Sequence, residues 1–116
     1  MALLVGCAPK TDLPIQTMEV AISGAPEQVI CRMQVAAQQT ALSLHVGHNR
    51  ANDVIAFRLI SEEYEVEAVN FMGGAKYELR LYVPSKEGPI VEAGEQALTR
   101  LAEAVSDSGP ACLNVN

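Results

Sequence analysis

The stretch YEVEAVNFMGGAKYELRLYV, residues 64–83, decides the fold. Apolar and polar residues alternate in two runs, 64–72 and 75–83, on either side of Gly73-Gly74. Alternation with a period of two is typical of a strand that buries one face. A pair of glycines suits a two-residue hairpin loop, because both loop residues can then take positive φ. The stretch therefore predicts a β-hairpin.

A two-residue loop at Gly73-Gly74 also predicts which residues face each other. On the apolar side Tyr64 faces Val83, Val66 faces Leu81, Ala68 faces Leu79 and Asn70 faces Tyr77. Asn70 is the one member of this set that does not suit a core. On the other side Glu67 faces Arg80, so an acid lies opposite a base. A slip of one residue would turn every apolar side chain towards water, so this register is expected to be the native one.

The remaining elements are predicted from hydrophobic periodicity. Strands are expected over 17–22, 42–46 and 54–60, and helices over 26–41 and from 89 to about 105. Pro26 suits a first helical turn, since its missing N–H costs nothing there. A polar turn is expected over 47–53, between two of the strands.

Together these elements predict a two-layer α+β domain of order β-α-β-β-β-α, with two helices packed on one face of an antiparallel sheet. A chain of 116 residues is long enough for one such domain with a buried core. Its hydrophobic content of 49% argues against disorder. Fourteen acidic and eight basic residues give a net charge of −6, which argues against binding to nucleic acid.

The first residues contain a different signal. Leu4-Val5-Gly6-Cys7 resembles the lipobox of bacterial lipoproteins, in which a small residue precedes the cysteine that receives the lipid. The resemblance implies that Cys7 is lipidated and that residues 1–7 are the remnant of a signal peptide that starts upstream. Residues 8–14 would then be a tether, followed by a single domain over 15–116. A signal peptide also has basic residues and about 7–15 apolar ones, so the alternative is an apolar N-terminus with an unmodified Cys7.

The other two cysteines form an even pair once Cys7 is set aside. In an oxidising compartment we expect a Cys31–Cys112 disulfide, which would tie the C-terminal tail across the start of the first helix. In a cytosolic protein the same residues would be two unrelated buried thiols. Neither cysteine has the close Cys or His neighbour that a zinc site requires, so we expect no zinc.

The two histidines, His45 and His48, are three residues apart. Side chains at this spacing on a strand point to opposite faces, so a shared metal ion would require a bend at Gly47. A solvated loop is the simpler interpretation.

An acidic strip precedes and enters the hairpin. It consists of Glu62, Glu63, Glu65 and Glu67. Carboxylates two residues apart on a strand lie about 7 Å apart, a spacing that suits a divalent cation or a glycosidase pair. The simpler interpretation is the wet face of a sheet whose charges are partly neutralised by Arg58 and Arg80. We expect no catalytic residue, no metal site and no cofactor.

The layout as a whole resembles the helix-grip domains of the BamC-type outer-membrane lipoproteins. The resemblance spans about residues 17–105 and rests on Ala25-Pro26, the Tyr64-led hairpin and the pattern Ala97-Leu98…Leu101. It implies a helix-grip-like arrangement in a small bacterial envelope lipoprotein. Such a protein would lie in the periplasm, anchored by its N-terminal lipid to the outer rather than the inner membrane.

Two functions from different classes follow. The first is a non-enzymatic, lipid-anchored envelope protein that binds another envelope protein, as an assembly accessory or an inhibitor. The alternative is a carrier of a small apolar ligand, held in a cleft between the sheet and the C-terminal helix. An interface filled by side chains would favour the first function, and an apolar cavity of several hundred Å³ would favour the second.

Overall fold

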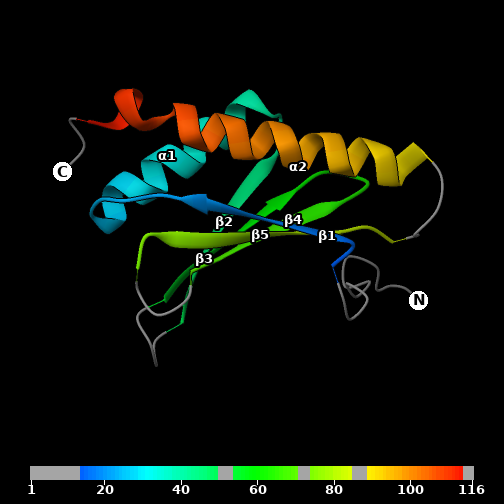
Figure 1. Ribbon diagram of the computed structural model, residues 1–116, viewed down its shortest axis with the longest axis horizontal. Coiled ribbons are helices and arrows are strands. Elements are labelled where there is room, and N and C mark those ends of the chain that lie inside the picture. Colours follow the sequence, from blue (N-terminus) through cyan, green and yellow to red (C-terminus); the bar gives the residue numbers. More distant parts are fainter. Residues whose placement is uncertain (1–13, 50–53, 71–73, 85–88, 114–116) are drawn as a thin grey trace.

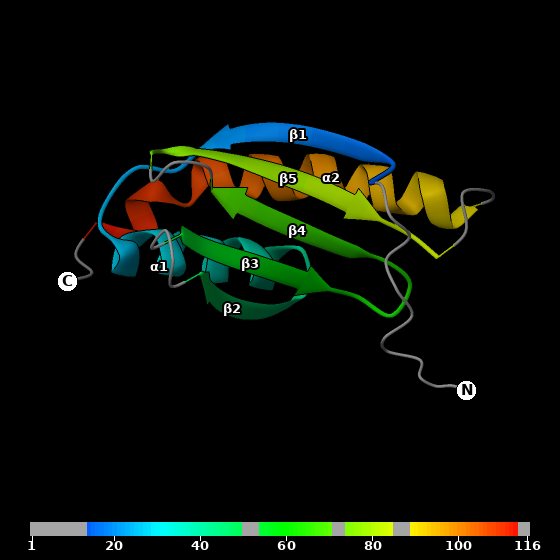
Figure 2. The ribbon, with the colours of Figure 1, turned by 90° about the horizontal axis from the view of Figure 1, so that it is seen from below.

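The computed structural model describes residues 14–49, 54–70, 74–84 and 89–113. In these ranges the chain forms β1 (Gln16–Ala21), α1 (Pro26–Gln39), β2 (Ser43–Asn49), β3 (Val54–Ile60), β4 (Glu65–Asn70), β5 (Lys76–Tyr82), α2 (Pro89–Asp107) and the 3-10 helix η2 (Gly109–Cys112). The strands make one antiparallel sheet in the order β1-β5-β4-β3-β2. Both helices cover one face of it (Figure 1), and no described helix covers the other, the open face (Figure 2). The predicted two-layer α+β fold is confirmed.

The predicted order β-α-β-β-β-α is wrong by one strand. The described part of the chain runs β-α-β-β-β-β-α, and the predicted order is one strand short because it counted the two strands of the predicted hairpin, β4 and β5, as one. The N-terminal strand β1 pairs with β5, the last strand in sequence. This long-range pairing places β1 at one edge of the sheet and β2 at the other.

The predicted hairpin register is confirmed. Glu67 pairs with Arg80, and Ala68 pairs with Leu79. Leu79 and Leu81 have no exposed surface, as the apolar side of the register requires. Gly73 of the expected loop and residues 71 and 72 before it lie outside the described residues.

Asn70 is buried within the apolar side of the hairpin. Its side-chain amide donates hydrogen bonds to the carbonyl of Gly74 and, at 3.1 Å, to that of Lys76. Both donors of the amide nitrogen are therefore satisfied, and this removes the main cost of burying it. The residue that did not suit a core thus binds the backbone where β5 begins.

Two predicted boundaries are wrong. The first helix ends at Gln39 instead of continuing to 41, because Ala41 has a φ of 60°, a left-handed conformation that ends a helix. Residues 47–49 were expected in a turn but belong to β2, where they pair with residues 54–56 of β3. Pairing with an apolar strand outweighs the turn-like composition of this segment. Residues 50–53 lie outside the described residues.

The core lies between the sheet and the two helices. Its largest fully buried side chains are Phe57, Ile22, Met33, Leu59, Leu79, Leu81, Leu98, Leu101, Val66 and Val105. Gly94 allows α2 to approach the sheet closely, because a Cβ there would lie 3.2 Å from both methyl groups of Leu81. The sheet and helices therefore share one packed core.

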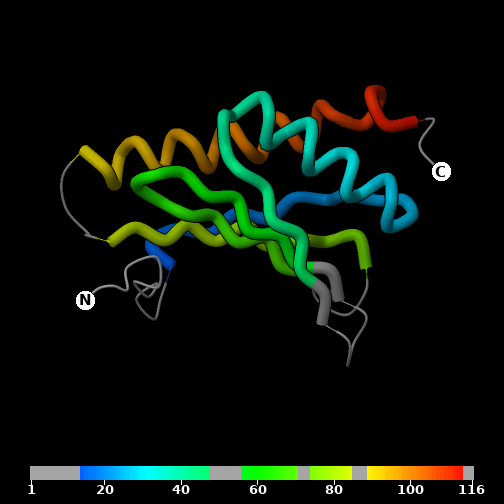
Figure 3. The backbone as a smooth tube through the Cα atoms, turned by 180° about the vertical axis from the view of Figure 1, so that it is seen from behind, coloured from blue at the N-terminus to red at the C-terminus, as the bar shows by residue number. Residues whose placement is uncertain are grey.

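The Cys31–Cys112 disulfide is present, with Cα atoms 5.9 Å apart, and this prediction is confirmed. Cys31 lies in α1, whereas Cys112 ends η2. The C-terminal end of the described chain and the first turns of α1 lie side by side in opposite views (Figures 1 and 3). The bond therefore fixes the end of the chain to the first helix.

Candidate functional site

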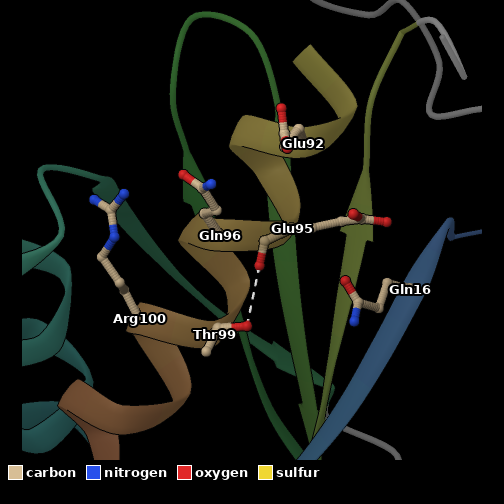
Figure 4. A pocket seen from close by; sticks show the side chains of 6 residues that line it. All are labelled: Gln16, Glu92, Glu95, Gln96, Thr99 and Arg100. Carbon is tan, nitrogen blue, oxygen red and sulfur yellow. Dashed lines mark hydrogen bonds between the residues drawn. The ribbon is translucent and has the colours of Figure 1, made fainter. Parts of the chain in front are cut away.

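The structure brings together β1, at the sheet edge, and the solvent-facing flank of α2. We call the hollow between them the β1–α2 groove. Its first part holds about 460 Å³ and is lined by Gln16, Glu92, Glu95, Gln96, Thr99 and Arg100. Figure 4 shows Gln16 on β1, projecting towards the helix that carries the other five.

The second part of the groove continues from Thr99 along the rest of β1. It holds about 480 Å³ and is lined by residues 18–21 of β1 and by Thr99, Ala102, Glu103, Ser106 and Asp107 of α2. Because Thr99 lines both parts, the groove follows β1 over its whole length. It is open to solvent, since most of its helix residues are exposed.

The groove is acidic. Its described lining contains four carboxylates on α2, namely Glu92, Glu95, Glu103 and Asp107, and one base, Arg100. Glu19 of β1 also lines it, but its side chain points to the other face of the sheet, where Lys76 lies 3.9 Å from its carboxylate. The groove therefore keeps a negative potential that favours a cationic partner.

Gln16 adds one unsatisfied group to this groove. Its side-chain oxygen Oε1 is buried and accepts no hydrogen bond from the residues that the structure describes. A buried acceptor without a donor is costly. The acceptors that the groove exposes to a partner are the carboxylates of α2.

The expected cleft between the sheet and α2 is filled. Leu98, Leu101 and Val105 of α2 have no exposed surface, and Leu81 of β5 is equally buried beneath them. In the described chain, this interface has the dense side-chain packing of a core. An interface filled by side chains favours the protein-binding function over the carrier function.

Both histidines lie on β2. His45 is exposed and pairs with Arg58, whereas His48 pairs with Ile55 further along the same unbroken strand β2. The strand continues through Gly47 without a break. Over the described ranges, no group of three or more His, Cys, Asp or Glu side chains could hold a metal ion.

The acidic strip divides into paired and solvated members. Arg58 forms two hydrogen bonds to the carboxylate of Glu65, at 2.9 and 3.1 Å, and this carboxylate is the main cause of the raised Arg58 pKa. Arg80 lies 3.6 Å from the carboxylate of Glu67. The expected neutralisation by Arg58 and Arg80 is therefore confirmed for these two glutamates. Glu62 and Glu63 are exposed in the turn before β4.

Sequence reasoning missed the β1–α2 groove. The groove forms only because β1 pairs with β5 and so lies beside α2. Residues so far apart in sequence leave no local signal of that pairing. The proposed lipidation site Cys7 lies outside the described residues.

No protein-family model matches the chain, and no curated protein is similar to it in sequence. In the part that the structure describes, no helix is long and apolar enough to cross a membrane.

Proposed function

We propose that this chain is a lipid-anchored protein of the bacterial envelope that acts by binding another envelope protein, without catalysis of its own. The Cys31–Cys112 disulfide carries the proposal. Disulfides persist in oxidising compartments such as the periplasm and are rare in the cytosol, where thiols are kept reduced. The bond therefore supports an envelope location independently of the lipobox-like segment.

Two features of the structure support binding to a protein. The interface between the sheet and α2 is filled, so the carrier alternative has no cavity there in the described residues. The hollow along β1 is instead open, polar and long. Such a surface suits a polypeptide better than a small apolar ligand, which requires an enclosed apolar pocket.

The anchor is tested on the protein made from its own gene and upstream sequence in its own host. We expect mass spectrometry to find a diacylated and N-acylated Cys7 and the protein to fractionate with membranes. More than one acyl chain is needed for stable anchoring. A Cys7→Ala variant is the control and should become soluble. An unmodified N-terminus in soluble protein would contradict the anchor.

The redox state is tested in the same cells. Acid quenching followed by alkylation with a mass-tagged maleimide should leave Cys31 and Cys112 unlabelled without reductant and labelled with it. The Cys112→Ser variant gives the reference for one free thiol. Two labelled thiols in untreated cells would contradict the envelope location.

A further inference from the structure

We propose that an extended, basic segment of the partner protein adds as a sixth strand to the free edge of β1 and lies in the β1–α2 groove. This rests on the proposed function, and it names the binding site and the chemistry of the segment that is bound. Strand addition at an open sheet edge is a general mode of peptide recognition, in which main-chain hydrogen bonds supply affinity.

The hydrogen-bond pattern of β1 shows which backbone groups are turned outwards. Ile22 donates its N–H to the carbonyl of Ala75 at 2.8 Å, in register with the ladder between β1 and β5. In an antiparallel ladder, alternate residues direct both backbone groups towards the same neighbour. Thr17, Glu19 and Ala21 therefore direct their N–H and C=O groups away from β5, along the free edge. No backbone bond to another described segment occupies these groups.

The dimensions of the edge suit a short strand. β1 has six residues, and at about 3.3 Å per residue it can pair with a segment of similar length. The flank of α2 forms one wall along this edge, from Glu92 to Asp107. At the opposite edge of the sheet, a hollow lies at the start of β2, between Ser43 and the turn at 61–64.

The charges of the groove determine the chemistry of the segment. Four carboxylates and one arginine of α2 line the described groove, so lysine or arginine side chains on the helix-facing side of an added strand would meet Glu103 and Asp107. Complementary charge of this kind speeds association and excludes acidic competitors.

The first test uses synthetic heptapeptides and the full disulfide-bonded chain labelled with ¹⁵N. The probe is acetyl-KTKVKTK-amide, and its matched controls are acetyl-ETEVETE-amide and a basic peptide N-methylated at alternate residues. We expect saturable amide shifts at Thr17, Glu19 and Ala21 and on the α2 flank with the basic peptide alone. No shift, equal binding by a control, or shifts along β2 instead would overturn the proposal.

Two variants locate the binding further. The double variant Glu103→Lys, Asp107→Lys should lower the affinity for the basic peptide by about tenfold, since two attractive charges become repulsive ones. Glu62→Lys with Glu63→Lys makes the same change of net charge away from the groove and should leave the affinity within about twofold. Ala21→Pro removes an N–H that β5 does not use, so it should keep the fold and abolish binding. Equal effects of the two charge-reversed pairs would overturn the proposal.

A photo-crosslinking residue placed at Ala21, or at Glu63 as a control, tests the site in the host envelope. An adduct from Ala21 that is lost in the Glu103→Lys, Asp107→Lys background supports strand addition. Adducts from Glu63 without any from Ala21 would overturn the groove but leave the proposed function standing. If mass spectrometry finds Cys7 without lipid and neither crosslinking position gives an adduct, the proposed function itself is overturned.

Discussion

Arg32 of α1 donates a hydrogen bond of 2.8 Å to the carbonyl of Val105, in the last turn of α2. Its Nε also donates to the hydroxyl of Ser108 at 3.3 Å. The last carbonyls of a helix lack partners within the helix and carry the negative end of its dipole. α2 has no basic residue of its own in its last turn. Arg32 supplies that charge from another helix, one residue from the disulfide at Cys31.

Arg32→Ala should lower the free energy of unfolding by about 1.5–3 kcal/mol, because it removes charge-assisted hydrogen bonds to a partly buried helix end. Urea denaturation of the oxidised protein measures the change. Arg58→Ala is the matched control, since Arg58 pairs with Glu65 from an exposed position and should contribute only about 0.2–1 kcal/mol. Equal losses from the two variants would show that Arg32 does not stabilise the end of α2.

Cys112→Ser should destabilise the protein by about 2–4.5 kcal/mol. The disulfide joins residues separated by 81 positions, and closing so large a loop restricts the unfolded chain strongly. Hydrogen exchange should become faster at η2, since its attachment to α1 is then reduced to side-chain contacts. Thermal unfolding with and without reductant provides the check. A reductant effect of the same size in Cys112→Ser as in the parent would contradict this assignment.

The hairpin could be predicted to the residue because all its determinants are local. Alternation fixes the faces, Gly73-Gly74 fixes the register, and Leu79 then falls in the core without further information. The disulfide could be predicted from cysteine number and position. The role of Arg32 could not, since the carbonyl that it binds lies 73 residues away. The β1–α2 groove was missed for the same reason, because it depends on the pairing of β1 with β5, which is far from it in sequence.

The two faces of the hairpin should differ sharply in their contribution to stability. Leu79→Ala should cost about 2–5 kcal/mol, because a fully buried leucine is replaced by a cavity. A double-mutant cycle between Glu67 and Arg80, on the open face, should give a coupling of only about 0.2–1 kcal/mol. Denaturant titrations of the single and double variants measure both quantities. A coupling as large as the leucine effect would mean that the open face is not open in solution.

Stability should fall at alkaline pH through Tyr77. Its ring packs against Phe57 with centroids 6.2 Å apart, and burial raises the pKa of its hydroxyl above the ordinary value of 10.0. The folded protein therefore holds this proton at a pH where the unfolded chain releases it. By linkage, the contribution is complete below about pH 10 and is lost as the pH rises through the raised pKa.

Tyr77→Phe should therefore flatten the dependence of unfolding free energy on pH above about pH 10. Between about pH 6 and 8 the variant and the parent should differ only by a constant offset, because the tyrosine is neutral in both states there. Urea titrations at a series of pH values give both slopes for each protein. The same alkaline slope in the variant and the parent would show that Tyr77 ionises as readily in the folded protein as in the unfolded chain. Water would then reach the core around Phe57 more than its burial indicates.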